Sequence, residues 1–171
     1  MKTRVNDNGK QMVKNESFEI GTAKANYIIK DILADFKKGI DFAVVFKGQK
    51  PTLLIGGADK LSWRFNLIAE FNKDLEIEKC FADVKNLVVM KCELIMRNTR
   101  KKVGEGRGSA ILGEGGNCRT IHSTIKMAEI RAKRDAVLNV FPIRDRFTQD
   151  METETFAESK VAVDGDGNIS L

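Results

Sequence analysis

Two clusters of basic residues are the part of this sequence best suited to chemistry. They occupy positions 97–107 and 126–134, and in the second cluster the cations outnumber Glu129 and Asp135 two to one. The nine residues are Arg97, Arg100, Lys101, Lys102, Arg107, Lys126, Arg131, Lys133 and Arg134. Long cationic side chains bind phosphate oxygens without reading a base sequence. We therefore predict that these residues contact a polyanion; the alternative is that they are ordinary solvated charges.

The charge along the chain is uneven. The net charge is +5, yet the segment from Thr148 to Leu171 carries six carboxylates and a single lysine, Lys160. The part before it is therefore more basic than the net charge suggests. A basic body with an acidic tail is typical of proteins that bind nucleic acid. We expect the tail to restrain that binding or to recruit a basic protein partner; a soluble basic protein with neither property is the alternative.

Other classes of function find little support. Cys80, Cys92 and Cys118 lack the spacing of a zinc site, and we expect buried thiols in a reducing cytoplasm. No run approaches the roughly 18 apolar residues of a membrane span, and the first residues lack the apolar stretch of a secretion signal. The acidic residues show no recognisable nuclease spacing, and His122 is the single histidine. We expect no enzyme activity, cofactor, metal or membrane partner, with Mg²⁺-dependent cleavage as an open alternative.

The hydrophobic periodicity predicts an α+β domain over residues 18–150, between a mobile N-terminal arm (1–17) and a flexible acidic tail (151–171). The expected elements, in chain order, are a helix at 23–38, a small hairpin of strands 40–46 and 52–55, a second helix at 58–71, three antiparallel strands at 75–84, 87–97 and 103–112, and a long helix at 120–141. The turn at 98–102 makes a basic hairpin tip. We therefore expect an antiparallel β-β-β-α core.

The last strand and the long helix carry patterns that predict how they pack. Gly104, Gly106 and Gly108 alternate, so one face of that strand has no side chains. The long helix, a subunit or a sugar-phosphate chain can approach that face. The helix has two apolar stripes, which predicts burial against a sheet on one side and a neighbouring helix or subunit on the other. The stripes are Ile121, Ile125, Ala128, Ala132 and Ala136, and Met127, Ile130, Val137, Leu138 and Phe141.

On the second helix, Lys60, Trp63 and Arg64 could approach a nucleic acid, although we interpret Trp63 as packed in the core.

Two motifs in the last strand and the long helix are Val103-Gly-Glu-Gly106 and Ala128-x-x-x-Ala132-x-x-Asp135-Ala136. The first is similar to the Val-Gly-x-Gly of a core strand in the Rad-fifty-two superfamily of single-strand annealing proteins, including its phage branches. The second resembles the helix signature of that family. The segments 50–61, Lys126-Met-Ala128 and Phe147-Thr-Gln-Asp150 look like those of small phage and mobile-element proteins. The resemblance covers about residues 40–150, but Leu138-Asn139 stand where the family tends to carry a Lys-Arg pair.

This resemblance implies ATP-independent binding of single-stranded DNA in a basic groove. It also implies annealing of complementary strands in homologous recombination, on a ring or a helical filament of many copies in the cytoplasm of a bacterial or phage-infected cell. Aromatic residues make up only 7% of the chain, which favours a grip on the backbone over stacking of bases. Two alternatives stay open: a single-strand-binding module that does not anneal, and a small phage protein that binds and modulates a host protein.

Overall fold

The computed structural model describes residues 23–44 and 49–148. The expected arm (1–17) and the expected acidic tail (151–171) lie outside the described residues. The elements are α1 (Ala23–Ala34), β1 (Phe42–Ala43), β2 (Thr52–Leu53), α2 (Ile55–Arg64), β3 (Leu67–Lys73), α3 (Leu75–Cys80), β4 (Leu87–Met96), β5 (Lys102–Ile111) and α4 (Ile121–Val140). The fold is α+β, as predicted.

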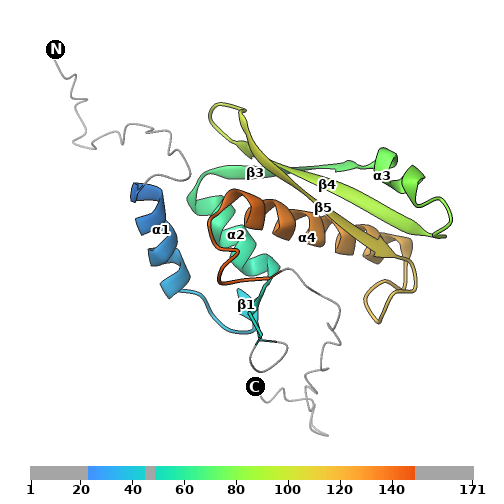
Figure 1. The fold of residues 1–171 in the computed structure, drawn as a ribbon, viewed down its shortest axis with the longest axis horizontal. Coiled ribbons are helices and arrows are strands. Elements are labelled where there is room, and N and C mark those ends of the chain that lie inside the picture. The colour runs from blue at the N-terminus through green and yellow to red at the C-terminus, as the bar shows by residue number, and fades with distance from the viewer. Residues whose placement is uncertain (1–22, 45–48, 149–171) are drawn as a thin grey trace, which may run out of the picture.

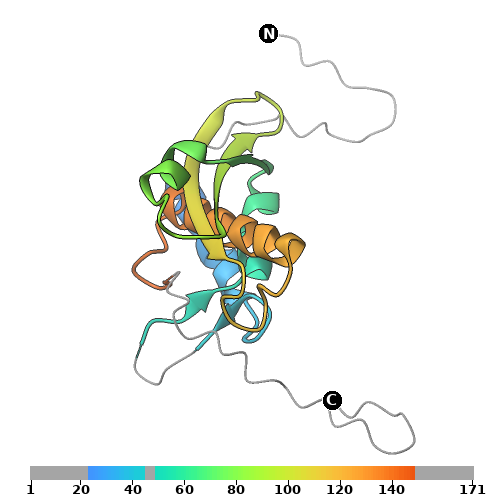
Figure 2. The ribbon, with the colours of Figure 1, turned by 90° about the vertical axis from the view of Figure 1, so that its right-hand side faces the viewer.

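The larger sheet has the order β3-β4-β5 with antiparallel pairing throughout, and β1 pairs with β2 in a separate two-stranded sheet. The large sheet lies along one side of α4, and α2 lies along the other side, so that α4 is the middle layer (Figure 1). The view from the side shows the strands crossing over α4 (Figure 2). The predicted β-β-β-α order is present, with α3 inserted between β3 and β4.

Helix α4 occupies the space beside the glycines of β5, where side chains would otherwise lie. A Cβ atom on Gly106 would lie 2.1 Å from the backbone nitrogen of Ala136, and one on Gly108 would lie 2.2 Å from that of Ala132. The alanine stripe of the helix therefore touches the backbone of the strand. Of the three partners that the sequence left open for the glycine face, the long helix occupies it. Neither a subunit nor a sugar-phosphate chain can lie against that face in this fold, because α4 fills the space.

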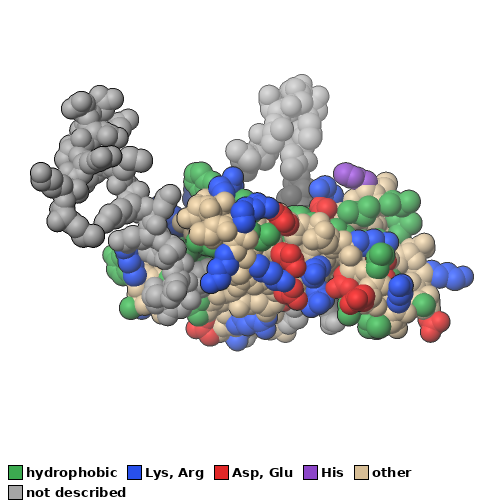
Figure 3. Space-filling model, turned by 90° about the horizontal axis from the view of Figure 1, so that it is seen from above, with side chains coloured by type: hydrophobic (Ala, Val, Ile, Leu, Met, Phe, Trp, Pro, Cys, Tyr) green, Lys and Arg blue, Asp and Glu red, His purple; other side chains and the backbone are tan. Residues whose placement is uncertain are grey.

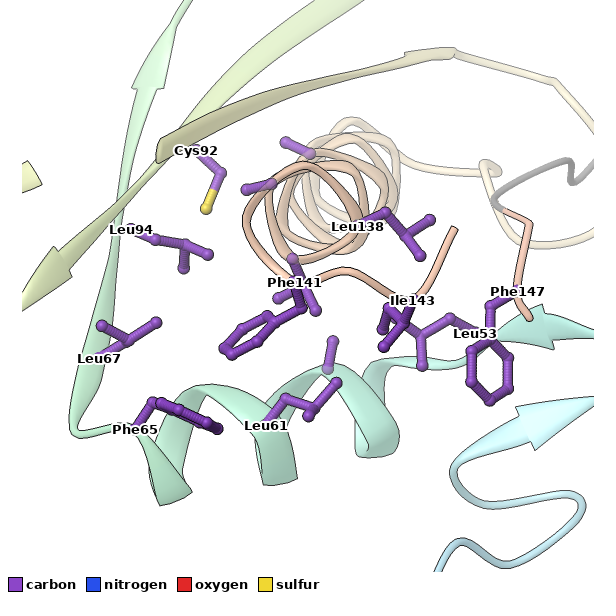
Figure 4. Packing of buried hydrophobic residues seen from close by; sticks show 14 of the residues in the cluster. Leu53, Leu61, Phe65, Leu67, Cys92, Leu94, Leu138, Phe141, Ile143 and Phe147 are labelled. Carbon is purple, nitrogen blue, oxygen red and sulfur yellow. The ribbon is translucent and has the colours of Figure 1, made fainter. Parts of the chain in front are cut away.

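The second apolar stripe of α4 is covered by α2 and the chain that follows α4. The rings of Phe141 and Phe65 meet edge to face with centroids 5.0 Å apart, and Leu138, Leu61 and Ile143 are buried beside them (Figure 4). Both predicted faces are thus buried, and the second neighbour is a helix of the same chain. Ile121, at the start of the first stripe, is exposed.

The second helix was predicted correctly as far as Arg64 but extended too far, and the strand expected at 75–84 was wrong. The second helix stops at Arg64, because Asn66 adopts a positive φ of 53°, and the chain then pairs with β4 as strand β3. Residues Leu75–Cys80 form a short helix where a strand was expected. The Asp74 side chain accepts the backbone N–H of Ile77 at 3.2 Å, which caps this helix.

The small sheet is joined to the end of the described chain. Thr148 forms a bridge to Thr52, and Phe147 packs against Phe36 and Phe42 with ring centroids 5.9 and 6.2 Å away. The first half of the Phe147-Thr-Gln-Asp150 motif is therefore part of the core. Among the described residues, no helix has the length and apolar character needed to cross a membrane.

Candidate nucleic-acid interface

The β4–β5 hairpin carries all five residues of the first basic cluster, and three of them lie at its turn. Its turn is closed by hydrogen bonds between Met96 N and Lys101 O and between Arg100 N and Met96 O, each 2.8 Å long. Arg100 takes a positive φ of 57° in this turn. Arg97, Arg100 and Lys101 are exposed, and we name these three residues the hairpin tip. Within residues 23–44 and 49–148, neither Arg97 nor Lys101 has an ion-pair partner.

Lys102 and Arg107 lie on the outer face of the sheet, the face turned away from α4. Register places Glu70, Glu93 and Glu105 directly opposite one another across β3, β4 and β5. Like charges in such a row repel each other unless cations lie between them. Lys102 bridges Glu93 at 2.8 Å and Glu105 at 2.5 Å, Arg107 contacts Asp74 at 2.8 Å, and Arg100 contacts Glu70 at 2.5 Å. The view onto the sheet shows blue and red side chains interleaved (Figure 3).

The pKa values on this face follow the ion pairs. Hydrogen bonds from Lys102 hold the pKa of Glu105 and of Glu93 below their ordinary values, and those two carboxylates raise the pKa of Lys102. The hydrogen bond from Arg107 lowers the pKa of Asp74. These residues stay charged at neutral pH. The outer face is therefore a ladder of balanced charges, and the excess of positive charge on the hairpin lies at its tip.

The second basic cluster does not join the first. On α4, Lys126 is exposed and pairs with Glu129 one turn away at 2.7 Å. Lys133 pairs with Asp59 of α2, and its side chain is 18% exposed. Both residues belong to α4, which lies beneath the sheet (Figure 1).

Two arginines of the second cluster have structural positions. Arg131 donates to the carbonyl of Ser109 at 2.6 Å and to both carboxylate oxygens of Glu114 at 3.0 Å, which ties the loop before α4 to the helix. Arg134 is only 2% exposed. A phosphate outside the protein cannot reach a guanidinium buried in this way. The position of Arg134 in the fold therefore contradicts the prediction that it contacts DNA.

Side chains of α4 also cover the free edge of β5. Asn139 donates to the carbonyl of Glu105 at 2.9 Å, Asp135 accepts the backbone N–H of Arg107 at 2.9 Å, and Arg131 binds the carbonyl of Ser109. These three residues are spaced by four along the helix and so lie in one line. Asp135 of the Ala-x-x-x-Ala-x-x-Asp-Ala pattern thus has a structural role, and this edge is closed to pairing with another strand.

The end of α2 exposes two of the three residues that the sequence suggested could approach a nucleic acid. Trp63 is 83% exposed, so the interpretation of Trp63 as a packed residue was wrong, and its neighbour Arg64 is also exposed. Lys60 points elsewhere, because its ammonium group pairs with the fully buried carboxylate of Asp41 at 2.5 Å. The core-forming residues of α2 are Ala58, Leu61 and the following Phe65, and their spacing leaves Trp63 on the opposite side.

The cysteines and the acidic residues among 23–44 and 49–148 are the remaining groups that could form a metal or thiol site in the fold. Cys92 and Cys118 are buried as predicted, whereas Cys80 is exposed. Burial raises the pKa of the Cys92 thiol to about 12, so Cys92 is protonated at neutral pH. The residues that the structure describes include no group of three or more His, Cys, Asp or Glu side chains able to hold a metal ion.

Comparison with protein-family models, with curated proteins and with solved structures found no match to this chain. The geometry and charge of the described residues therefore carry any inference about what this protein binds.

Proposed function

We propose that this protein binds single-stranded DNA at the hairpin tip and anneals complementary strands without ATP. The observation that carries the proposal is the position of Arg97, Arg100 and Lys101 on one exposed turn, at the end of a sheet whose other cations are balanced by carboxylates. Cations on a protruding turn can bind successive phosphates and release their counterions. Such contacts fix the backbone and leave the bases free to test a complementary strand.

The glutamate row makes the tip the favoured contact within the hairpin. A phosphate placed over the middle of the outer face would lie near Glu70, Glu93 and Glu105 as well as near the cations that pair with them. At the tip, Glu70 is the only carboxylate of the described residues that forms an ion pair with one of the three cations. Binding at the tip therefore disrupts fewer existing ion pairs.

Assembly into a ring or filament remains part of the proposal and is supported by the resemblance to annealing proteins. The two patterns that first suggested subunit contacts, the glycine face of β5 and the second stripe of α4, are both satisfied inside one chain. Contacts between copies must use other surfaces. The same proposal assigns the protein to homologous recombination in the cytoplasm. It also includes a basic protein partner for the acidic tail.

A triple substitution, Arg97→Ala/Arg100→Ala/Lys101→Ala, tests the proposed site. We expect binding to a single-stranded oligonucleotide to weaken roughly five-fold or more. The slope of log affinity against log salt should become less negative by about 2, since each phosphate contact to a single strand contributes about −0.7. Fluorescence anisotropy at several salt concentrations measures both quantities, and annealing of two complementary labelled strands is measured in parallel.

The matched control removes three other exposed cations, through Lys79→Ala/Lys85→Ala/Arg119→Ala. These residues lie near α3 and in the loop before α4, away from the tip. The control changes the net charge by the same amount, so an equal loss of affinity in both variants would mean that only the overall charge matters. Natural affinity in the tip variant would show that the DNA binds elsewhere.

A second candidate function has its own observation. An apolar hollow of about 310 Å³ lies between α3 and the sheet, lined by Ile77, Phe81, Val84, Leu87 and Ile111 among others, and Phe81 is 54% exposed. A hollow of this kind suits an apolar side chain of a protein partner. Recovery of a partner that survives nuclease treatment, together with no affinity for DNA, would favour a protein that modulates another protein.

A further inference from the structure

Trp63 occupies an unusual position for the only tryptophan of the chain. It is the residue before the last in α2, and it is 83% exposed although the indole ring is the largest apolar side chain available to a core. The core needs no residue at this position, because α2 packs through Ala58, Leu61 and Phe65. The exposed indole is available for contact with another molecule, and tryptophan is enriched at such contacts.

Backbone hydrogen bonds place Trp63 at the hairpin end of the sheet. The carbonyl of Trp63 accepts the N–H of Asn66 at 3.0 Å, and the carbonyl of Asn66 accepts the N–H of Arg97 at 3.0 Å. Two hydrogen bonds therefore link the main chain of Trp63 to the first residue of the hairpin tip. The end of α2 and the β4–β5 turn lie at the same end of the molecule (Figure 1).

The surroundings of Trp63 at this end are basic. Arg64 follows it directly and is exposed, and Arg97 is exposed across the Asn66 turn. In the described part of the chain, no carboxylate forms an ion pair with Arg64 or Arg97. An aromatic ring between cations is the combination by which proteins hold single-stranded nucleic acid: the cations take the phosphates and the ring stacks on a base.

We propose that Trp63 stacks on an unpaired base of the strand whose phosphates are bound by Arg64 and the hairpin tip. This inference rests on the proposed function, since it assigns a base contact to the same end of the molecule. A base in a duplex is already stacked on its neighbours, so a stacking site favours single strands over double strands. Stacking needs only the π-face that every base has, so the site accepts any sequence.

The single tryptophan allows a direct test, because all indole fluorescence of the full chain comes from Trp63. Titration with single-stranded oligothymidylate should quench this fluorescence over the same concentration range in which anisotropy reports binding. An oligomer of abasic deoxyribose phosphates should still bind in a salt-dependent way but should leave the fluorescence nearly unchanged. Trp63→Ala should weaken binding of the oligothymidylate by about ten-fold, whereas Trp63→Phe should keep most of the affinity.

Phe81→Ala is the matched control, because Phe81 is an exposed aromatic residue beyond α3 at the opposite end of the sheet. It should leave the affinity unchanged. If the natural protein binds the oligothymidylate without quenching, and Trp63→Ala binds as tightly, the stacking site is overturned while the proposed function stands. If Trp63→Ala changes the particle size and leaves DNA affinity intact, Trp63 is a contact between copies and the inference is wrong. If the natural protein binds no single-stranded DNA, the proposed function itself fails.

Discussion

At the scale of single residues, the cations differ in what surrounds them. Arg97 and Lys101 are exposed on a turn, Lys102 lies between two glutamates, and Arg131 is held by a carboxylate and a carbonyl. A guanidinium that already makes two charge-assisted bonds stabilises the protein and is less available to a phosphate. Residue type alone could not separate these cases.

The pair of Arg131 and Glu114 gives a prediction for stability against pH. The hydrogen bond from Arg131 holds the pKa of Glu114 below its ordinary value of 4.5. A carboxyl whose pKa is lower in the folded state adds stability that is complete above pH 4.5 and is lost as the pH falls through the lowered pKa. Glu114→Gln should therefore lower the free energy of unfolding at pH 7, and its difference from the natural protein should shrink below pH 4.5.

Urea unfolding at a series of pH values measures this difference. In an Arg131→Ala background, the same Glu114→Gln change should have a much smaller effect, because the partner that lowers the pKa is gone. An equal effect of Glu114→Gln in both backgrounds would show that the pair does not act through this contact.

At the scale of elements, β5 and α4 form the centre of the fold. The strand gives one face to the helix through its glycines, and its edge is closed by Arg131, Asp135 and Asn139. The capping box of Thr120 and Ser123 fixes where the helix begins. The hairpin tip is therefore carried by a rigid pair of elements, which suits a site that must hold phosphates at defined spacing.

Gly106→Ala tests this packing. The new Cβ would lie 2.1 Å from the backbone nitrogen and 2.6 Å from the Cα of Ala136, and backbone atoms cannot turn aside as a side chain can. We expect a loss of about 2–3 kcal/mol or more in the free energy of unfolding, as for other overpacked cores. Thermal or urea unfolding measures the change.

Gly116→Ala is the matched control, because its nearest neighbour would be a side-chain atom of Arg119 at 3.9 Å and its φ is not in the left-handed region. It should change the free energy of unfolding by no more than about 0.5 kcal/mol. Equal stability of the two variants would mean that α4 does not contact β5 as described.

At the scale of the whole molecule, charge is arranged by region. The outer face of the sheet is balanced, the hairpin tip is basic, and the segment after the described core is acidic, with five carboxylates and Lys160 between Met151 and Leu171. An acidic segment tethered to a basic surface competes with a nucleic acid for the same cations. The net charge of +5 hides this arrangement.

Deletion of residues 151–171 should leave the unfolding midpoint unchanged, because Phe147 and Thr148, which close the fold against Phe36, β1 and β2, are retained. The affinity for single-stranded DNA should stay equal or rise, with the larger gain at low salt, where screening is weak. Anisotropy titrations at two salt concentrations and a thermal melt check both statements. A clear loss of stability or of affinity would show that the segment is structural or contributes to the site.

The sequence by itself determined β4, β5, α4 and the burial of α4 on two sides. These predictions depend on local periodicity: alternation along β4, alternate glycines along β5, and two apolar stripes along α4. The sequence-based prediction was wrong between residues 65 and 84, where the short segments have hydrophobic patterns that fit either a strand or a helix. Pairing with β4 decided β3, and the Asp74 cap favoured α3.

Only the tertiary structure decided which cations are available and what approaches the glycine strand. The carboxylates that pair with Arg131, Arg107 and Lys133 lie 17, 33 and 74 positions away in the sequence. Local sequence patterns, which span about one helix or strand, therefore could not predict these ion pairs. The exposure of Trp63 is also decided by tertiary packing, because α2 turns the face with Ala58 and Leu61 to the core and leaves Trp63 on the opposite face. Charge and aromatic type are written in the sequence, but the environment that makes them a binding site depends on contacts between distant segments.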